Sequence, residues 1–306
     1  MSAEQRQGLL LVILAAAGYA FLPILAKFAY EAGLTPQETV TWRFAIATPV
    51  IWLLVRRIES GTPSTLPRLK LVLLGVLFSA AALVAFYSLE LIPASTFIVL
   101  AYLYPAMVAL LSLLNGENLP LSGWLALPLT LIGVALTVPD FMTGFAGADA
   151  NGILLAVANA VIYSLYIVIS SRLLRAQSAL PTASAISISG SLASLIIIGL
   201  LTGLQLPPTP QAWLVVAGIA LCCTVMPITA FFAAIQKLGA PQAAILSTLE
   251  PVLVVFLSMV LLDETMLPVQ WLGAALIIAA AILLQVGKLY TAKRQRRPVI
   301  IPPTVT

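Results

Sequence analysis

Residues Ala94–Leu125 read ASTFIVLAYLYPAMVALLSLLNGENLPLSGWL, and residues Ala240–Leu272 repeat the pattern as APQAAILSTLEPVLVVFLSMVLLDETMLPVQWL. Each stretch is an apolar segment with a proline near its middle, followed by a short acidic turn and a tryptophan. Leu and Ala matches are common by chance in so apolar a chain, but the shared proline and the shared Glu-to-Trp spacing are not. The chain therefore contains an internal duplication of about half its length. The pairs that carry it are Pro105 with Pro251, Glu117 with Glu264, and Trp124 with Trp271.

The composition is that of a protein that crosses a membrane several times. Of the 306 residues, 61% are hydrophobic and 8% are charged, and the mean hydropathy is +1.08. Soluble domains carry about 25% charged residues, so this surface does not suit water. The net charge of +4 comes from basic residues scattered over loops and one tail, which does not indicate nucleic-acid binding. We expect the first apolar run, from Gly8 to Ala29, to span the membrane and not to be cleaved as a signal peptide.

Apolar runs bounded by charged residues, Pro or Gly predict an all-α polytopic protein with ten transmembrane helices of roughly 20 residues each. The longest connection, Pro139–Ala150, is rich in Gly and Asp and divides the chain into two halves of five helices. We expect a first five-helix repeat at residues 1–142, a second at 150–290 and a basic, Pro-containing cytoplasmic tail at 291–306. The expected helices are 8–30, 38–57, 69–91, 94–114, 121–138, 151–173, 180–203, 211–236, 240–262 and 268–290.

The positions of Lys and Arg predict how the chain is oriented. With the N-terminus inside, nearly all of the 15 Lys and Arg residues fall on inner segments. The positive-inside rule then puts both termini in the cytoplasm. Because five spans is an odd number, the second half must enter the membrane from the opposite side, and the halves are predicted to be inverted repeats. Inverted repeats with interrupted helices are typical of secondary transporters that work by alternating access.

Several short motifs add a family resemblance. They are Trp42-Arg43-Phe44 in the second helix, Pro105 before Gly116-Glu117, Pro251 before Asp263-Glu264, and Gly133 and Gly273 in the fifth and tenth helices. Through them the chain resembles the EamA type of the drug/metabolite transporter superfamily, with two tandem EamA domains. The resemblance implies a central cavity lined mainly by helices 1, 3, 4, 6, 8 and 9, a place in the bacterial inner membrane, and export of amino acids or related metabolites. Aromatic amino acids lead, since the most studied relatives with this arrangement export them.

Four prolines interrupt helices that this cavity would involve. A proline leaves the carbonyl four residues earlier without its usual donor, and such a carbonyl must be buried in protein or face a wet cavity. The carbonyls freed in this way are those of Tyr19, Ala101, Cys223 and Ser247. The breaks are either packing kinks or hinges at a transport site. The prolines are Pro23, Pro105, Pro227 and Pro251.

Glu250 is the sharpest single candidate, because it precedes Pro251 near the middle of the ninth helix. An ionisable group at that depth costs at least about 2.5–3.5 kcal/mol and marks a functional site by default. Its carboxyl group could bind a substrate amino group or carry a coupling proton. The structural alternative is a protonated Glu hydrogen-bonded to a neighbour. Its counterpart in the first repeat is Tyr104, so the site is expected to be asymmetric.

Lys27 and Arg43 oppose the charge trend and need another explanation. Pairing with Glu31 or Glu38 in the first outer loop would give both cations a structural role, and we expect an ion pair for Arg43. The planar fork of Arg43 would also suit a substrate carboxylate, which is the alternative.

Aromatic side chains are expected at the cavity, because Tyr offers a flat amphipathic substrate an apolar face and a hydroxyl group. Lipid-facing or interfacial positions are the alternative for these residues, as interhelix hydrogen bonding is for Asn159 and Ser164. The predicted substrate-binding residues are Tyr19, Phe86, Tyr87, Tyr102, Tyr104, Asn159, Tyr163, Ser164, Ser247 and Glu250.

Other classes of protein fit the sequence less well. The chain has no histidine, which removes serine–histidine hydrolysis and most zinc chemistry, and it has no P-loop for an ATP-driven pump. We therefore expect no enzyme, cofactor or metal. A multidrug or cation exporter, a nucleotide-sugar or lipid-carrier transporter and a non-transporting scaffold stay open as alternatives. Proton coupling or passive transport, and a monomer or a homodimer in the lipid bilayer, stay open too.

Overall fold

The computed structural model is helical throughout the residues that it describes. These are residues 3–58, 66–92, 97, 100–114, 121–137, 149–175, 180–239, 243, 246–247, 249–262 and 267–295. The turns Gly116-Glu117 and Asp263-Glu264, most of the connection predicted at Pro139–Ala150, and the tail beyond Gln295 lie outside them. The predicted limits of the two repeats and of the tail therefore stay predictions.

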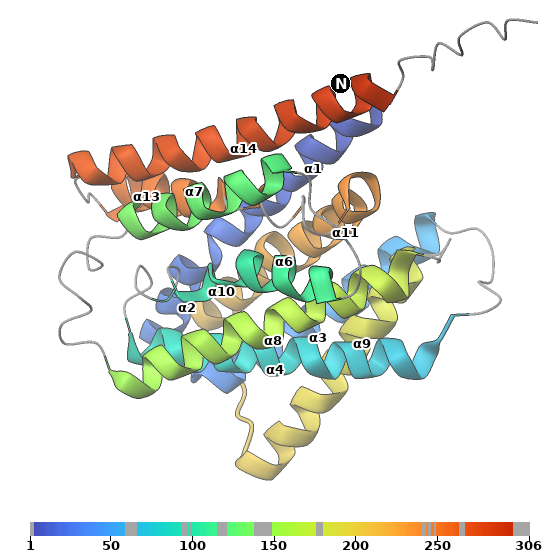
Figure 1. Cartoon of the computed structure of the whole chain (residues 1–306). Coiled ribbons are helices and arrows are strands. Elements are labelled where there is room, and N and C mark those ends of the chain that lie inside the picture. Colours follow the sequence, from blue (N-terminus) through green and yellow to red (C-terminus); the bar gives the residue numbers. More distant parts are fainter. Residues whose placement is uncertain are drawn as a thin grey trace, which may run out of the picture.

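The helices follow one another along the chain as Figure 1 shows. The first half holds α1 (Ala3–Ala20), α2 (Leu22–Glu31), α3 (Pro36–Ile58), α4 (Arg68–Leu91), α6 (Tyr104–Leu114) and α7 (Leu121–Thr137). The second half holds α8 (Ala150–Arg175), α9 (Leu180–Thr202), α10 (Pro210–Ala220), α11 (Met226–Leu238), α13 (Leu249–Leu262) and α14 (Pro268–Gln295). A π-helical turn, Leu221–Val225, joins α10 to α11.

Six helical stretches of the described chain are long and apolar enough to cross a membrane. They are Ala3–Glu31, Pro36–Arg57, Arg68–Leu91, Ala150–Leu173, Pro181–Thr202 and Pro210–Leu238, and they cover the corresponding predicted ranges almost completely. Shorter apolar helices occupy Leu121–Leu136 and Trp271–Ala280. The chain is therefore a polytopic helical membrane protein, as its composition predicts, while the total of ten spans stays a prediction.

The fourth and ninth helices differ from the continuous helices predicted at 94–114 and 240–262. The helices α6 and α13 begin only at Tyr104 and Leu249. A turn precedes each of them, at Tyr102–Leu103 and at Ser247. Each proline thus lies in the first turn of its helix, where a missing backbone N–H costs nothing. The two matched stretches are broken at matched places, just before their prolines.

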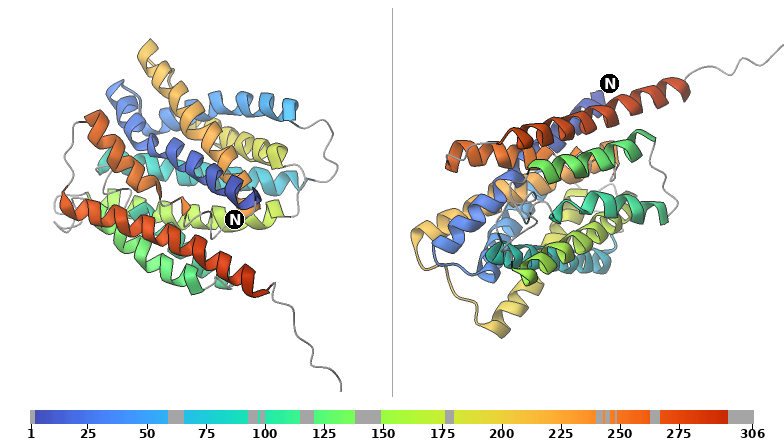
Figure 2. Two further views of the ribbon diagram at one scale, coloured as in Figure 1. Left: turned by 90° about the horizontal axis from the view of Figure 1, so that it is seen from above. Right: turned by 60° about the vertical axis from the view of Figure 1, so that its left-hand side comes forward.

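Helices from the two halves pack against one another in exchanged pairs. The helix α4 of the first half packs on α8 of the second, and α11 of the second half packs on α1 of the first. In the same way α6 packs on α8 and α13 packs on α1. The remaining counterparts pair directly, α3 with α9 and α7 with α14, and the latter two lie side by side in Figures 1 and 2. The halves therefore interlock and share one packing pattern.

The helices α4 and α9 approach each other closely enough for their backbones to touch. A Cβ atom at Gly75 would lie 1.8 Å from the Ser187 backbone oxygen, and one at Gly190 would lie 2.5 Å from that of Val72. The Ser191 hydroxyl donates to the Gly75 carbonyl over 2.7 Å. Small residues at this spacing allow such contact between membrane helices, so this pair forms a rigid part of the fold.

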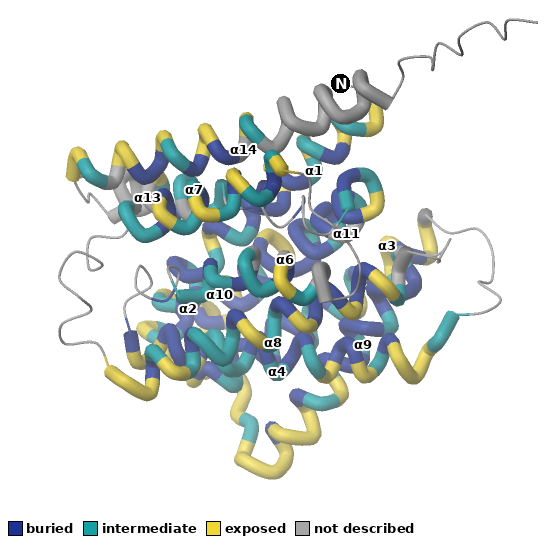
Figure 3. The backbone as a smooth tube through the Cα atoms, viewed as in Figure 1, coloured by how far each residue is buried: buried dark blue, intermediate teal, exposed yellow. Residues whose placement is uncertain are grey.

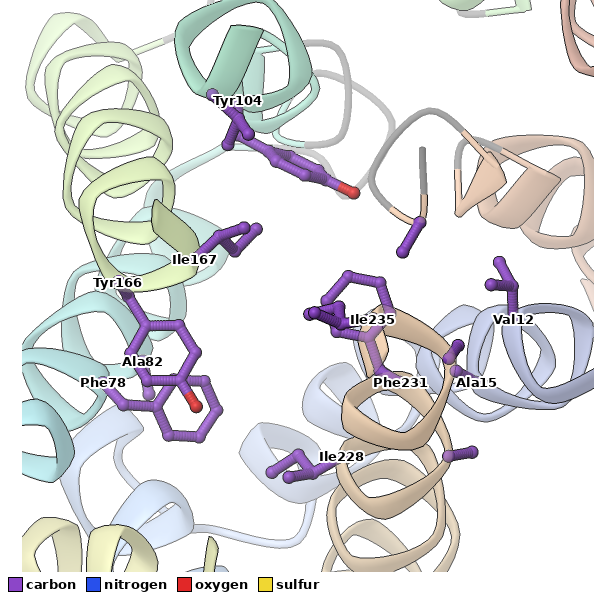
Figure 4. Close-up of a cluster of buried hydrophobic side chains, with 14 of the residues drawn as sticks. Val12, Ala15, Phe78, Ala82, Tyr104, Tyr166, Ile167, Ile228, Phe231 and Ile235 are labelled. Carbon is purple, nitrogen blue, oxygen red and sulfur yellow. The ribbon is translucent and has the colours of Figure 1, made fainter. Parts of the chain in front are cut away.

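Large apolar side chains cover the outside of the helices, as contact with lipid requires. Leu73, Leu154 and Leu214 are 57%, 67% and 75% exposed. Figure 3 shows exposed positions along the outer side of α14 and buried ones between the helices. Figure 4 shows buried side chains of α4, α6, α8 and α11 directed toward one central region. Because the centre of the fold is largely apolar, a polar side chain buried there needs a structural or functional reason.

Candidate functional site

A cavity of about 130 Å³ opens at this centre and is lined by both halves of the chain. The first half contributes α1 to α4 and the segment that leads into α6, and the second contributes α8, the π-helical turn, α11 and the start of α13. Since a water molecule occupies about 30 Å³ in the liquid, the cavity can hold several waters or a small organic group. The lining includes α3, through Arg43, beyond the helices that the family resemblance implies.

The helix breaks surround this cavity. The chain leaves α1 at Phe21 and re-enters a helix at Leu22, with Pro23 in its first turn and in the cavity wall. The turns at Tyr102–Leu103 and Ser247 reach the cavity through Tyr102 and Ser247 themselves. The π-helical turn adds Cys223. Interrupted helices occur where their free backbone groups find other partners, and here they gather around one space.

Glu250, in the first turn of α13, lines the cavity and has a partner. The Tyr102 hydroxyl makes a side-chain hydrogen bond with the Glu250 carboxyl group, and it also donates to the Ser247 carbonyl over 3.2 Å. That carbonyl also accepts the backbone N–H of Glu250 over 2.9 Å. The Tyr104 hydroxyl bonds to the Ser247 hydroxyl. The broken segments of the two halves are therefore joined through Tyr102, Tyr104 and Ser247, next to the acid.

Aromatic rings form a continuous row that runs away from this acid. Figure 4 shows Tyr104 above the central region and Tyr166 against Phe78 at its side. The centroid distances along the row are 5.6 Å for Tyr102–Tyr104, 5.1 Å for Tyr104–Tyr163, 6.0 Å for Tyr163–Tyr166, 4.7 Å for Tyr166–Phe78 and 5.7 Å for Phe78–Phe44. These separations are typical of attractive ring pairs. Of these rings, Tyr102, Tyr104, Tyr163 and Phe78 line the cavity and give it an apolar, flat-sided wall with hydroxyl groups on it.

Arg43 stands where this row ends, near the middle of α3. Its side chain lines the cavity and is only 4% exposed. The guanidinium carbon lies 4.8 Å from the centroid of the Phe44 ring and 5.1 Å from that of Phe86. Within the described part of the chain, its Nε and Nη1 atoms are buried without a hydrogen-bond partner. The ion pair expected for Arg43 with Glu31 or Glu38 is therefore wrong for these two nitrogens, because burial in α3 keeps them away from the outer loop.

Lys27 does have partners, which are also not those expected. Its ammonium group donates to the Leu89 carbonyl over 2.6 Å and reaches the Ile92 carbonyl at 3.5 Å. These carbonyls belong to the end of α4, where the last groups of a helix lack internal partners and the dipole favours a cation. The position of Lys27 against the charge trend is thus explained by helix capping and not by a loop ion pair.

Most of the predicted substrate-binding residues come together in this cavity. Those that line it are Tyr19, Phe86, Tyr102, Tyr104, Asn159, Tyr163, Ser247 and Glu250. Asn159 also donates to the Ala81 carbonyl over 2.9 Å, the interhelix bond that was its alternative role. Their function in binding stays a prediction that their positions support.

Two predicted residues do not line the cavity. Tyr87 is 39% exposed on the outside of α4, and the buried Ser164 hydroxyl donates to the Val161 carbonyl of its own helix. Each directly follows a residue that does line it, Phe86 and Tyr163. Consecutive residues of a helix point about 100° apart, so a residue next to one that lines the cavity can point elsewhere, as Tyr87 and Ser164 do.

The cavity also contains residues that the sequence did not single out. Phe78, Ile228 and Phe231 supply apolar wall, and Cys223 lies close enough to Arg43 to interact with it electrostatically. Helical spacing was the signal that could have found Phe78, which shares a face of α4 with Ala82 and Phe86. Among the described residues no group of three His, Cys, Asp or Glu side chains lies together as a metal site.

Comparison with known proteins identifies relatives over the whole chain. An uncharacterized transporter, sll1319, from Synechocystis sp. is 24% identical over 92% of this chain and 94% of its own length. The uncharacterized transporter YcbK from Bacillus subtilis is 22% identical over 95% and 97%. The pseudopaline exporter CntI from Pseudomonas aeruginosa is 31% identical over 142 residues, which are 44% of this chain and 48% of that one.

The fold and the duplication have counterparts as well. A crystal structure with 21% sequence identity superposes with a TM-score of 0.71 over 95% of this chain and 99% of that chain, which shows a shared fold. The EamA-like transporter family matches twice, at residues 6–138 and 150–286. These two matches correspond to the two duplicated halves and together cover most of the chain. The chain belongs to the EamA-like transporter family.

Proposed function

We propose that this chain is a secondary transporter that exports small metabolites through the central cavity, with amino acids as the leading substrates. One observation carries the proposal. A cavity, a partly buried acid and matched helix breaks from both halves coincide in one place. A scaffold that transports nothing would have no use for this combination, because each of its elements costs stability in a membrane.

Alternating access is the mechanism that the duplicated fold supports. Two inverted five-helix halves would exchange conformations, so that the cavity opens to one side and then to the other. The breaks near Pro23, Pro105, Pro227 and Pro251 would act as hinges, and the π-helical turn before Pro227 is of the kind found at functional hinges. The proposed setting is the bacterial inner membrane with both termini in the cytoplasm, where the cavity would load substrate from inside.

The contacts of Tyr102 suggest how protons could be coupled to this exchange. Its single O–H group can donate to Ser247 or to Glu250, but not to both. A protonated Glu250 would donate to the Tyr102 oxygen and leave the Tyr102 proton for the Ser247 carbonyl. An ionised Glu250 would draw that proton to itself and leave the Ser247 carbonyl with the Glu250 N–H as its donor. The protonation state of the acid would thus act directly on the proposed hinge.

Aromatic amino acids suit the chemistry of the cavity wall. The row of rings from Tyr102 to Phe78 offers flat apolar contact, and Glu250 offers a site for an amino group. The similarity to a pseudopaline exporter supports export of a metabolite. A cation or drug exporter is the second candidate, favoured by the acid among aromatic rings, which attract cations.

Counterflow in proteoliposomes tests the proposal. Vesicles holding the full chain would be loaded in turn with Trp, Phe, Tyr, Thr, Cys, a nucleotide sugar or a lipophilic cation, and uptake of the labelled compound would be followed. We expect the aromatic amino acids to exchange fastest. Exchange of the lipophilic cation alone would replace the proposal by the second candidate, and no exchange of any probe would contradict it.

A further inference from the structure

We propose that Arg43 binds the carboxylate group of the transported molecule, so that the cavity selects compounds that carry an amino group and a carboxylate at opposite ends of the site. This inference rests on the proposed function and deepens it.

Arg43 has buried N–H donors without a hydrogen-bond partner among the described residues, and burying such donors is unfavourable. A guanidinium group carries five N–H donors in a planar fork. Two of its three nitrogens, Nε and Nη1, are buried with no partner in the described part of the chain, although the residue is 96% buried. A buried charge without a hydrogen-bonded partner is strongly unfavourable. Such an arrangement needs a compensating group that arrives from elsewhere.

Among the described residues, the neighbours of Arg43 do not supply that group to Nε and Nη1. The titratable residues that act on it electrostatically are Cys223, Tyr19 and Tyr30, and these are ordinarily neutral at pH 7. The rings of Phe44 and Phe86, at 4.8 Å and 5.1 Å, attract the cation but accept no hydrogen bond in its plane. The rings do not satisfy the N–H donors of Nε and Nη1, and the Arg43 side chain is part of the cavity lining.

The chemistry of the missing group follows from this geometry. A carboxylate matches the planar fork with two parallel hydrogen bonds and neutralises its charge. An amine would be repelled, and a neutral hydroxyl would leave the charge uncompensated. The site therefore favours an anionic oxygen group, and the small cavity favours a compact one.

The position of Glu250 makes the site bipolar. Tyr19 lies within electrostatic range of both Glu250 and Arg43, and all three residues line the cavity. An amino group held at Glu250 and a carboxylate held at Arg43 would both contact the same space beside Tyr19. An α-amino acid satisfies both ends at once, whereas a simple organic cation satisfies one end and repels the other.

A ligand-truncation experiment tests this assignment on the purified full-length chain. Binding would be measured for L-Trp, for tryptamine, which lacks the carboxylate, and for indole-3-propionate, which lacks the amine. The variants are Arg43→Gln, Arg43→Lys and, as matched control, Arg57→Gln, which removes an exposed guanidinium from the end of the same helix. Counterflow of L-Trp would be recorded for each variant.

We expect Arg43→Gln to weaken binding of L-Trp and indole-3-propionate roughly 10- to 100-fold, the usual effect of losing a hydrogen bond to a charged group. Tryptamine should bind at least as well as before. Arg43→Lys should recover part of the loss, since it keeps the charge but not the fork, and Arg57→Gln should change nothing.

Other results would contradict either the role of Arg43 or the proposed function. If L-Trp binding and counterflow survive in Arg43→Gln, the role of Arg43 is wrong and the proposed function stands. If all three ligands lose affinity equally, Arg43 only maintains the fold and the proposal fails. If the unsubstituted chain exchanges no amino acid, the proposed function fails, and this inference fails with it.

Discussion

Arg43 and Glu250 are ionisable residues that line one cavity, and they differ in the partners that the protein gives them. Glu250 shares a hydrogen bond with Tyr102, which also holds the broken backbone at Ser247. Arg43 has two nitrogens that bond to nothing in the described chain. Glu250 therefore has a hydrogen-bond partner within the protein, whereas Arg43 keeps donors that a bound ligand could use. The first arrangement suits a group whose protonation changes the protein's own hydrogen bonds, and the second suits a group that binds substrate.

Replacing Glu250 should produce the largest effect, because it removes both a binding group and the proposed proton carrier. We expect Glu250→Gln to reduce affinity for amine-bearing substrates roughly 10- to 100-fold and to leave indole-3-propionate nearly unaffected. Glu90→Gln, at the exposed end of α4, is the control. Binding assays with both ligands check this. Full activity in Glu250→Gln would show that Glu250 neither binds the substrate nor carries a proton, and would favour a passive facilitator.

The rate at which charged reagents modify the Cys223 thiol can report the charge of the nearby Arg43 side chain. In a Cys222→Ala variant, Cys223 is the remaining thiol, and it lies beside Arg43 in the cavity. An anionic methanethiosulfonate should modify it roughly 10-fold faster than a cationic one, because fixed charge steers ions. Substrate should protect the thiol, and a Cys223→Ala variant is the control. Equal rates for the two reagents would mean that the guanidinium charge is already neutralised.

The two cations that oppose the positive-inside trend should respond differently to neutralisation. Lys27→Met removes the cation that caps α4 and should cost about 1 kcal/mol, which lowers the melting temperature by about 2–4 °C. Arg43→Met, without ligand, should leave it unchanged or raise it, since it removes a buried unpaired charge. Melting curves in detergent check both. A lower melting temperature for Arg43→Met would show that the cation has a structural partner.

Removing one hydroxyl group should have the smallest effect. Tyr102→Phe takes away the bond to Glu250 and should slow transport about 5-fold, as the loss of one buried hydrogen bond does. It should also weaken the dependence of transport on an imposed proton gradient. Tyr87→Phe, on the exposed side of α4, is the matched control. If transport by Tyr102→Phe depended on the proton gradient as before, the Tyr102 hydroxyl would have no part in the proposed proton coupling.

The spans and the acid end of the site were largely predictable from the sequence. Length and hydropathy decide membrane spans, so 38–57, 69–91 and 151–173 needed no tertiary information. Glu250 was predictable because a carboxyl group before a mid-span proline has no trivial explanation. The duplication also identified Tyr104 as the residue that corresponds to Glu250 in the first repeat. The Tyr104 hydroxyl bonds to that of Ser247, whose carbonyl accepts from Tyr102.

The environment of the cations was not predictable, because it depends on contacts far apart in the sequence. Glu31 and Glu38 are near Lys27 in the chain, but its ammonium group reaches carbonyls at Leu89 and Ile92. Likewise, sequence distance could not show that Arg43 would lie beside the rings of Phe44 and Phe86. Nor could it show that its Nε and Nη1 atoms would have no hydrogen-bond partner among the described residues. Tyr87 and Ser164 were misplaced for a simpler reason, since the choice of residues ignored which face of the helix each one occupies.

A structure of the chain with its substrate tests the central claim most directly. Crystals grown with 5-bromo-L-tryptophan, or with a brominated form of whichever amino acid gives the strongest counterflow, would locate the bromine by anomalous diffraction. We predict one site in the central cavity, with the carboxylate at the Arg43 fork, the amino group at Glu250 and the ring against the row of tyrosines. A substrate bound outside this cavity, or inside it with its carboxylate away from Arg43, would contradict the account.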